Sequence, residues 1–432
     1  MAEGNIGPMW YVRGPQSWPI LPRSMSVSTL QDIEACPRRW SLRVASYPHI
    51  WRGHGYPPQL RPAVFRGMVV HRTLQVLTAA LARAGCSGVG DATLPGVLRA
   101  IGGYTKAIDD CVDHLADPQR DNPRMLSMST VLETTRAQIP TLRQQVQLLM
   151  SRVQLPLAAI RDTDRQINST GRGAYSAYAR QPLHAGSYAE LELHASGLGW
   201  IGKIDLLKLS TAECEIVDFK TGAPSPDHQF QILVYNLLWT RDADLNPTGR
   251  VADRLTLAYV DGDVAVRPTT GAELCALEED LQRRTQDART ATQGLPPQAK
   301  PSWRNCHMCP VRQLCDEYWS AGAQQHISVE TPSSGSFARG RHLDVEVEIA
   351  RQRDRTTWDA TVLLASGNMP RPGSPVQLHL PRPNETHRAI LSCASRARLL
   401  DVVLAGGRGS DLPETLTLTS LSEAYAVHFP DR

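Results

Sequence analysis

The chain has 432 residues, of which 41% are apolar and 21% charged, as is ordinary for a soluble globular protein with a sizeable core. Its formal net charge of +3 argues neither for nor against a nucleic-acid partner, so only local patches bear on that question. There is no run of apolar residues as long as the roughly 18 that a membrane span needs, and the first residues lack a basic-then-apolar signal pattern, so we expect a cytoplasmic protein without a membrane-spanning helix.

The N-terminal region is predicted to be an extended arm followed by helices. Residues 1–25 are rich in Pro, Gly and Trp, which favour an arm that docks on the body. The stretch Ser28–Gln31 has the form of a capping box, so it predicts the start of a helix that leads to Cys36. Residues 63–84 carry apolar positions at helical spacing around His71, which predicts a second helix.

The middle of the chain changes from helical to strand-like patterning. Residues 85–185 are mostly helical in pattern, and the polar, Gly- and Ser-rich residues 161–181 are expected to form a loop. The elements predicted next are strands at 190–193, 199–209 and 215–219, a helix at 229–239, strands at 255–260 and 264–266, and a helix at 271–294. This order predicts an α/β core with a mixed sheet.

The last hundred residues differ from this core. Residues 321–338 are rich in Gly, Ser and Pro, which is typical of a linker. Short alternating runs such as Val345–Ile349 and Val376–Leu380 then predict a small all-β module over residues 339–432, either a barrel or a sandwich.

The strongest chemical signal is a pair of aspartates and a lysine on two neighbouring predicted strands. Gly202-x-x-Asp205 lies on one strand, and Asp218 and Lys220 lie two apart on the next, so these two side chains share a face. Carboxylates are suitable ligands for Mg²⁺ or Mn²⁺, and an ammonium beside them can orient an attacking water and stabilise negative charge. Lys203 and Glu215 carry no compelling role and are taken as surface charges.

A second signal is the spacing Cys306-x-x-Cys309-x(5)-Cys315. In a reducing compartment such clustered cysteines indicate metal ligands, and three thiolates this close suit zinc or an iron–sulfur cluster. His307 is a poor fourth ligand because it lies inside the chelate loop. The remaining scattered cysteines are predicted to be small apolar core residues: Cys86, Cys111, Cys214, Cys275 and Cys393.

The motif set resembles that of RecB-like PD-(D/E)XK nucleases. The matching motifs are Gly67-x-x-x-His71, Gly202-x-x-Asp205, Asp218-x-Lys220-Thr221-Gly222 and Gln231-x-x-x-Tyr235. The resemblance implies a restriction-endonuclease-like core in which His71, Asp205 and Asp218 hold Mg²⁺ or Mn²⁺ and Lys220 is the catalytic lysine. Gln231 and Tyr235 would border the site. An acidic residue of this family matches either Glu190 or Glu192, and Glu190 is preferred.

The cysteines extend the resemblance. AddB-type nucleases and CRISPR-associated adaptation nucleases carry one cysteine before the His helix and three after the Gln-x-x-x-Tyr helix, and the four hold a [4Fe–4S] cluster. By this likeness Cys36 joins Cys306, Cys309 and Cys315 as cluster ligands, with Zn²⁺ as the alternative. The resemblance covers residues 26–320, with 85–185 as a helical insertion.

The sequence therefore predicts a metal-dependent DNA nuclease that cuts single-stranded DNA or duplex ends, in DNA repair, CRISPR adaptation or anti-phage defence; RNA stays open as a substrate. No G-x-x-x-x-G-K-[ST] motif occurs, so a motor would be a separate helicase or ATPase partner. A catalytically silent DNA-binding scaffold and a redox-sensing regulator are the competing hypotheses. For the C-terminal module, Trp358 and a group of arginines from Arg339 to Arg355 suit an OB-like single-strand binder, and a docking domain is the equal alternative.

Overall fold

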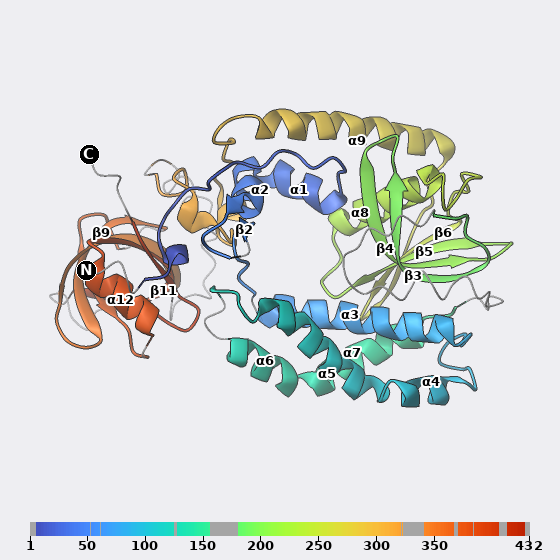
Figure 1. Ribbon diagram of the computed structural model, residues 1–432, viewed down its shortest axis with the longest axis horizontal. Coiled ribbons are helices and arrows are strands. Elements are labelled where there is room, and N and C mark those ends of the chain that lie inside the picture. The colour runs from blue at the N-terminus through green and yellow to red at the C-terminus, as the bar shows by residue number, and fades with distance from the viewer. Residues whose placement is uncertain are drawn as a thin grey trace.

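The computed structural model describes residues 6–51, 53–60, 62–124, 128–155, 180–320, 322, 341–366, 370–382, 384–405 and 413–427. They form a helical group, a five-stranded sheet covered by helices, and a β-barrel at the other end of the molecule (Figure 1). The predicted mixed α/β architecture is confirmed. The predicted linker 321–338, apart from residue 322, and residues 161–179 of the predicted loop lie outside the described residues. Within the described part of the chain, no helix has the length and apolar character to cross a membrane.

The N-terminal arm packs on the barrel. A short 3-10 helix, η2 (Pro8–Trp10), places Trp10 against Tyr425, with ring centroids 5.4 Å apart. Val12 N then donates a hydrogen bond to Ala426 O at 2.9 Å. The first described residues and the last strand of the chain therefore lie in one core.

Two helices follow the arm. The predicted capping box at Ser28–Gln31 is wrong, because Ser26 caps α1 (Val27–Ala35) by accepting a hydrogen bond from Thr29 N at 3.3 Å. Several hydroxyl residues crowd this stretch, and each is a competent cap, so the pattern alone did not select one. Cys36 is the N-cap residue of α2 (Pro37–Val44), which starts with a proline, as the first helical position favours.

The helical group is built on α3 (Pro62–Arg83), which matches the predicted helix around His71. The other short elements of this region are β1 (Ser46–Tyr47), β2 (Gly53–His54), α4 (Leu94–Ala100), α5 (Gly103–Ala116), η3 (Asp117–Gln119), α6 (Met128–Ala137) and α7 (Ile139–Ser151). One face of α3 packs on α5, α6 and α7, and the helix also contacts the sheet. The described residues of the predicted helical insertion are thus mostly helical up to Ser151.

The central sheet runs in the order β3-β4-β5-β6-β7. Its strands are β3 (Gly186–Ala195), β4 (Trp200–Leu209), β5 (Cys214–Lys220), β6 (Arg254–Tyr259) and β7 (Gly262–Val266), and the helices are α8 (Pro226–Arg241) and α9 (Gly271–Thr292). Neighbouring strands are antiparallel except β5 and β6, which are parallel. Val217 and Phe219 face the α3 core, whereas Ile216 faces the core under α8 and α9. The sheet is therefore buried on both faces.

The C-terminal module is a closed barrel. Its strands are β8 (Arg341–Gln352), β9 (Thr357–Ala365), β10 (Pro375–His379), β11 (Arg396–Ala405) and β12 (Glu414–Thr417), with β13 (Glu423–Ala426) added on β11. β12 closes the barrel by pairing with both β10 and β11. The all-β prediction is wrong in one respect, because α12 (Glu385–Cys393) lies between β10 and β11, capped by the Asn384 side chain.

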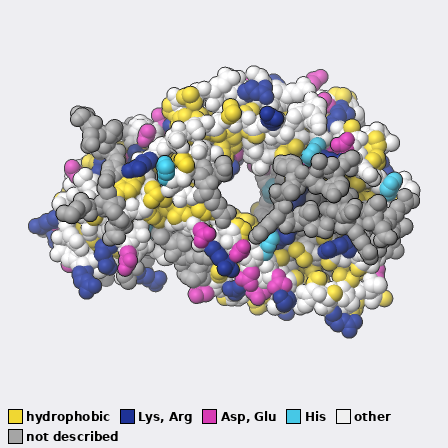
Figure 2. Space-filling view, viewed as in Figure 1, with side chains coloured by type: hydrophobic (Ala, Val, Ile, Leu, Met, Phe, Trp, Pro, Cys, Tyr) yellow, Lys and Arg dark blue, Asp and Glu magenta, His cyan; other side chains and the backbone are white. Residues whose placement is uncertain are grey.

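A buried ion pair joins the barrel to the helical group. Arg124 follows η3, and its Nε and Nη2 atoms donate to the Glu423 carboxylate of β13, both at 2.8 Å. The same guanidinium donates to the carbonyl oxygens of Pro57 and Pro310. Arg124 therefore connects four segments that are distant in sequence. In the space-filling view the face is hollowed at its centre, between the α1–α2 side and α3 (Figure 2).

We expect Arg124→Met to lower the free energy of unfolding by about 3–5 kcal/mol, because it leaves the Glu423 carboxylate buried without its partner. Urea unfolding followed by tryptophan fluorescence measures this. The control is Arg283→Met, which breaks an exposed helical pair with Asp287 and should cost less than about 1 kcal/mol. Equal effects of the two changes would contradict the interpretation of Arg124 as a connecting residue.

Candidate active site and cysteine pocket

The predicted site residues lie where two strands separate. β4 and β5 are paired only from Leu206, opposite Val217, to Leu209, opposite Cys214. Beyond this pairing the two strands diverge, which leaves Asp205 and Asp218 at the opening of a fork. The Asp205 Oδ2 atom accepts a hydrogen bond from Phe219 N at 2.6 Å, so the carboxylate spans the fork.

A chain of polar contacts runs from β5 to α8. Lys220 Nζ lies 2.5 Å from Asp218 Oδ2 and donates to Gln231 Oε1 at 2.7 Å. Gln231 Nε2 in turn donates to the Tyr235 hydroxyl at 2.6 Å. Gln231 and Tyr235 are one turn apart on α8, so both face the sheet. The ammonium of Lys220 is therefore held between a carboxylate and an amide.

His71 and Glu190 approach the fork from other elements. His71 Nδ1, on α3, lies 4.0 Å from Asp205 Oδ2. Glu190 occupies the β3 position between Ala189, opposite Leu206, and Leu191, opposite Ile204, so it stands across from Asp205. Its φ angle of 56° is in the left-handed region, a conformation that side chains other than glycine rarely adopt and that is common at functional sites.

Glu192 lies elsewhere. Its carboxylate is 2.6 Å from His194 Nε2, and its side chain is 56% exposed. Glu190 instead pairs with Lys203, a residue that the sequence had suggested to be a surface charge. The geometry thus favours Glu190 over Glu192 as the acidic residue near Asp205.

The charged groups around the fork shift one another's pKa values. Burial, and then the neighbouring Asp218 carboxylate, raise the pKa of Asp205 above its usual range. Burial, and then the positive charge of Lys220, lower the pKa of His71, which keeps its imidazole in the neutral form that binds metal ions. Two carboxylates that repel each other beside a neutral imidazole form a set that a divalent cation would stabilise.

Two residues near the fork were not anticipated. His228 Nδ1 lies 2.9 Å from the Tyr259 hydroxyl. Burial, and then Lys220, lower the pKa of His228, which places it in the field of the site. Tyr259 ends β6 and is the parallel register partner of Lys220. The carboxyl ends of adjacent parallel strands lie at the same edge of a sheet. This rule could have predicted from the sequence that Tyr259 lies near Lys220.

The two motif glycines allow helices to approach the strands. A Cβ atom on Gly202 would lie 2.6 Å from Leu238 Cδ1 and 3.1 Å from Tyr235 Cε1, so glycine lets α8 pack against β4. A Cβ on Gly67 would lie 3.3 Å from Thr221 Oγ1, so glycine lets α3 approach the turn after Lys220. Both motifs therefore contribute packing as well as side-chain chemistry.

As placed, the donors do not form a closed ligand set. Among the described residues, no three His, Cys, Asp or Glu side chains are close enough together to hold a single metal ion. The chemistry of the donors nevertheless suits Mg²⁺ or Mn²⁺, because His71, Asp205 and Asp218 meet at the fork and Asp218 Oδ2 accepts no hydrogen bond besides its ion pair with Lys220.

The four predicted cysteine ligands line one pocket. Cys36, at the start of α2, meets Cys306, Cys309 and Cys315 around a cavity that is partly open to solvent. Cys306 ends α10 (Trp303–Cys306), and Cys315 follows the 3-10 helix η5 (Arg312–Leu314). All four are free thiols. The pocket brings together residues that are about 270 positions apart in the chain.

Burial and nearby arginines shift the pKa values of these thiols in opposite directions. Burial raises the pKa of Cys306 to about 11 and that of Cys309 to about 12. Three arginines of the pocket act in the opposite direction: Arg38 on Cys315, Arg39 on Cys306 and Arg312 on Cys309. A buried set of thiols beside arginines suits an occupant that binds them as thiolates.

The burial of several other cysteines and of Glu215 differs in part from the sequence-based prediction. Cys86, Cys111 and Cys214 are buried as predicted, whereas Cys275 and Cys393 are exposed. Both lie on amphipathic helices, α9 and α12, on faces that the core does not cover. The predicted surface charge Glu215 is buried and is held by Lys208 and Thr256.

Comparison with known families bears directly on this arrangement. A family model described as the PD-(D/E)XK nuclease superfamily matches residues 24–316, which is more than half of the chain. The chain belongs to the PD-(D/E)XK nuclease superfamily. Members of this superfamily are typically metal-dependent nucleases. The match spans the fork, α8 and the cysteine pocket, and it ends before the barrel.

Two further comparisons add little to the superfamily assignment. No curated protein matches the chain. One solved structure, titled "Crystal structure of SSO0001", is 13% identical to the chain, with the alignment covering 58% of this chain and 97% of that one. Its TM-score of 0.21 is too low to carry an argument about the fold.

We expect Gly202→Ala to lower the free energy of unfolding by about 1–3 kcal/mol, because the new methyl group overlaps Leu238 and presses on Tyr235. Gly197→Ala is the matched control, since a Cβ there meets nothing within 4 Å. Denaturant unfolding of both variants measures the difference. A Gly202→Ala protein as stable as the control would show that α8 does not need this close approach.

Proposed function

We propose that the chain is a Mg²⁺- or Mn²⁺-dependent deoxyribonuclease that cuts single-stranded DNA or duplex ends and carries a [4Fe–4S] cluster. The pathway we propose is DNA repair, CRISPR adaptation or anti-phage defence, together with a separate helicase or ATPase. The observation that carries the proposal is the meeting of Asp205, Asp218 and Lys220 with His71 at the fork of β4 and β5.

Each side chain at the fork has a task that follows from its surroundings. His71, Asp205 and Asp218 would hold the metal ion, which supplies positive charge to the scissile phosphate and lowers the pKa of a bound water. Lys220 presents an ammonium whose position is fixed by Asp218 and Gln231, so it orients the attacking water and stabilises developing negative charge. Tyr235 fixes Gln231.

For the cysteine pocket we propose a [4Fe–4S] cluster, with a single zinc ion as the alternative. Zinc binds sulfur at about 2.3 Å in a tetrahedron, which brings its ligands together around one point. The four cysteines line one cavity. In a [4Fe–4S] cluster each cysteine binds a different iron atom, so the ligands stand further apart.

We propose that the barrel is OB-like. Its five closing strands follow the order β10-β9-β8-β11-β12, with β10 parallel to β12 and a helix between the third and fourth strands. Trp358 is fully buried in the barrel, so it offers no surface for stacking a base. Arg339 lies outside the described residues. The burial of Trp358 favours a docking role over single-strand binding.

A second candidate is a catalytically silent DNA-binding scaffold. The observation that favours it is the lack of three described donors close enough to hold a metal ion as placed. The two candidates differ in a simple way, because a scaffold binds DNA without turnover in either metal.

The first test is cleavage of end-labelled single- and double-stranded DNA with Mg²⁺ or Mn²⁺, using anaerobically purified protein. We expect Asp218→Asn to lower the cleavage rate by about 10²–10³-fold, because it removes one carboxylate of the metal site while keeping the buried shape. Binding is measured in parallel by fluorescence anisotropy. A wild-type protein that binds DNA tightly and cuts it in neither metal would support the scaffold instead.

A pair of variants on one strand tests the acidic residue beside Asp205. We expect Glu190→Gln to slow cleavage at least about tenfold, since it removes negative charge from the fork. Glu192→Gln should cleave at the wild-type rate, because Glu192 pairs with His194 away from the site. The reverse ranking of the two variants would assign the role to Glu192.

A further inference from the structure

The cysteine pocket and the barrel share one arginine. Arg312 lies between Cys309 and Cys315, lines the pocket and is 2% exposed. Its Nη1 atom donates to Cys309 O at 3.0 Å. Its other nitrogen atoms reach the barrel: Nε lies 2.5 Å and Nη2 3.2 Å from the Asp344 carboxylate of β8. A single side chain therefore touches both the pocket and the barrel.

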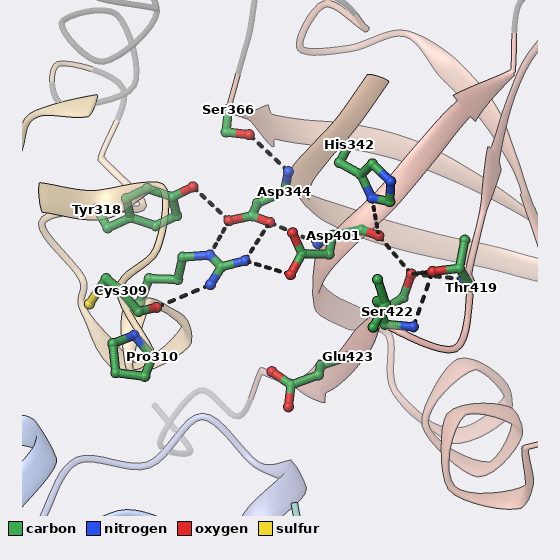
Figure 3. Close-up of polar contacts among 12 residues, drawn as sticks. Cys309, Pro310, Tyr318, His342, Asp344, Ser366, Asp401, Thr419, Ser422 and Glu423 are labelled. Atoms are coloured by element: carbon green, nitrogen blue, oxygen red, sulfur yellow. Dashed lines mark hydrogen bonds and ion pairs between the residues drawn. The ribbon is translucent and has the colours of Figure 1, made fainter. Parts of the chain in front are cut away.

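Other contacts repeat this connection. The Tyr318 hydroxyl, which also belongs to the pocket, donates to Asp344 Oδ2 at 2.7 Å. Figure 3 shows Cys309 and Tyr318 on the pocket side, facing Asp344 and Asp401 on the barrel side. Arg398 of β11 donates to Gln313 O at 2.6 Å, so the segment between the two cysteines is held by backbone contacts as well.

The barrel is distorted at this contact. Asp401 has a φ of 53°, in the left-handed region, and β11 shifts its register against β8 between Leu399 and Val402. In this conformation Asp401 N donates to Asp344 Oδ1 at 2.9 Å and the Asp401 carboxylate lies 3.2 Å from Arg312 Nη2. A bulge re-aims side chains at the expense of strain, and here it aims a second carboxylate at Arg312.

We propose that the C-terminal barrel locks the cysteine pocket: Asp344 holds Arg312, and through it the segment from Cys309 to Cys315, in the arrangement that retains the metal centre. Arg312 and Asp344 are thus positioning residues for the cysteines. The proposal rests on the proposed [4Fe–4S] cluster for the identity of the occupant, whereas the lock itself is a property of the chain.

The lock works in both directions. Docking of the barrel stabilises the occupied pocket, and by linkage an occupied pocket stabilises docking. The buried charges make the coupling steep, because an undocked barrel would separate Arg312 from both Asp344 and Asp401 and leave it as an unpaired charge. Loss of the metal centre therefore loosens the barrel.

The test uses the full-length protein purified without oxygen. Asp344→Asn removes one of the two carboxylate charges that hold Arg312, and Tyr318→Phe is a milder variant that removes one hydrogen bond to the Asp344 carboxylate. The matched control is Asp359→Asn, because Asp359 of β9 pairs with Arg351 and Arg353 of its own hairpin. The first measurement is the rate at which the visible absorption of the cluster decays in the presence of an iron chelator.

We expect Asp344→Asn to lose the absorption at least about tenfold faster than the wild type, which corresponds to about 1.4 kcal/mol of coupling. The rate for Tyr318→Phe should lie between those of Asp344→Asn and the wild type. Asp359→Asn should lose the absorption at the wild-type rate. Equal rates in all four proteins would overturn the lock.

A second measurement separates this inference from the proposed function. The metal-free protein is treated with a thiol reagent, and the labelled cysteines are identified by mass spectrometry, with the exposed Cys275 and Cys393 as internal references. Faster labelling of Cys309 and Cys315 in Asp344→Asn supports the lock even where the purified protein contains no iron and sulfide, a result that would overturn the cluster alone. Unchanged labelling overturns the lock.

Discussion

The divergence of β4 from β5 is the constraint on which the site depends. Up to Leu206 and Val217 the strands are hydrogen-bonded, and the backbone groups satisfy each other. Past that point Asp205 replaces the missing strand partner by accepting from Phe219 N, so a carboxylate takes over a backbone role. The helices α3 and α8 pack on opposite faces of the sheet, and the opening places His71 of α3 near Asp205 and Gln231 of α8 against Lys220.

Long-range closure makes this arrangement stable. The cysteine pocket draws the start of α2 to the segment after α9, although about 270 residues separate them. A metal centre that fixed two such distant points would remove loop-closure entropy from the unfolded state, and it would make that closure part of folding. Segments that are distant in the sequence therefore meet at two places, at the cysteine pocket and at the fork.

Local pattern was sufficient for much of the fold and for the residue types at the site. Period-two alternation located β3 to β7, and the order of the motifs anticipated that His71, Asp205 and Lys220 would approach one another. What pattern could not provide were facts that depend on three-dimensional packing. Tyr259 lies near the site because β6 pairs in parallel with β5 and places it opposite Lys220. Trp358 is buried because it lies on the inner face of β9. The helix α12 was missed because nine residues between strands give a weak periodic signal.

The docking of Trp10 on Tyr425 has a consequence for how the molecule is made. The arm is synthesised well before its partner strand, because more than 400 residues separate Trp10 from Tyr425. During synthesis Met9 and Trp10 remain without the surface that buries them until β13 has been made, so this core cannot close before the intervening chain has been synthesised. The arm therefore reaches its folded position late, although it precedes its partner strand in the sequence.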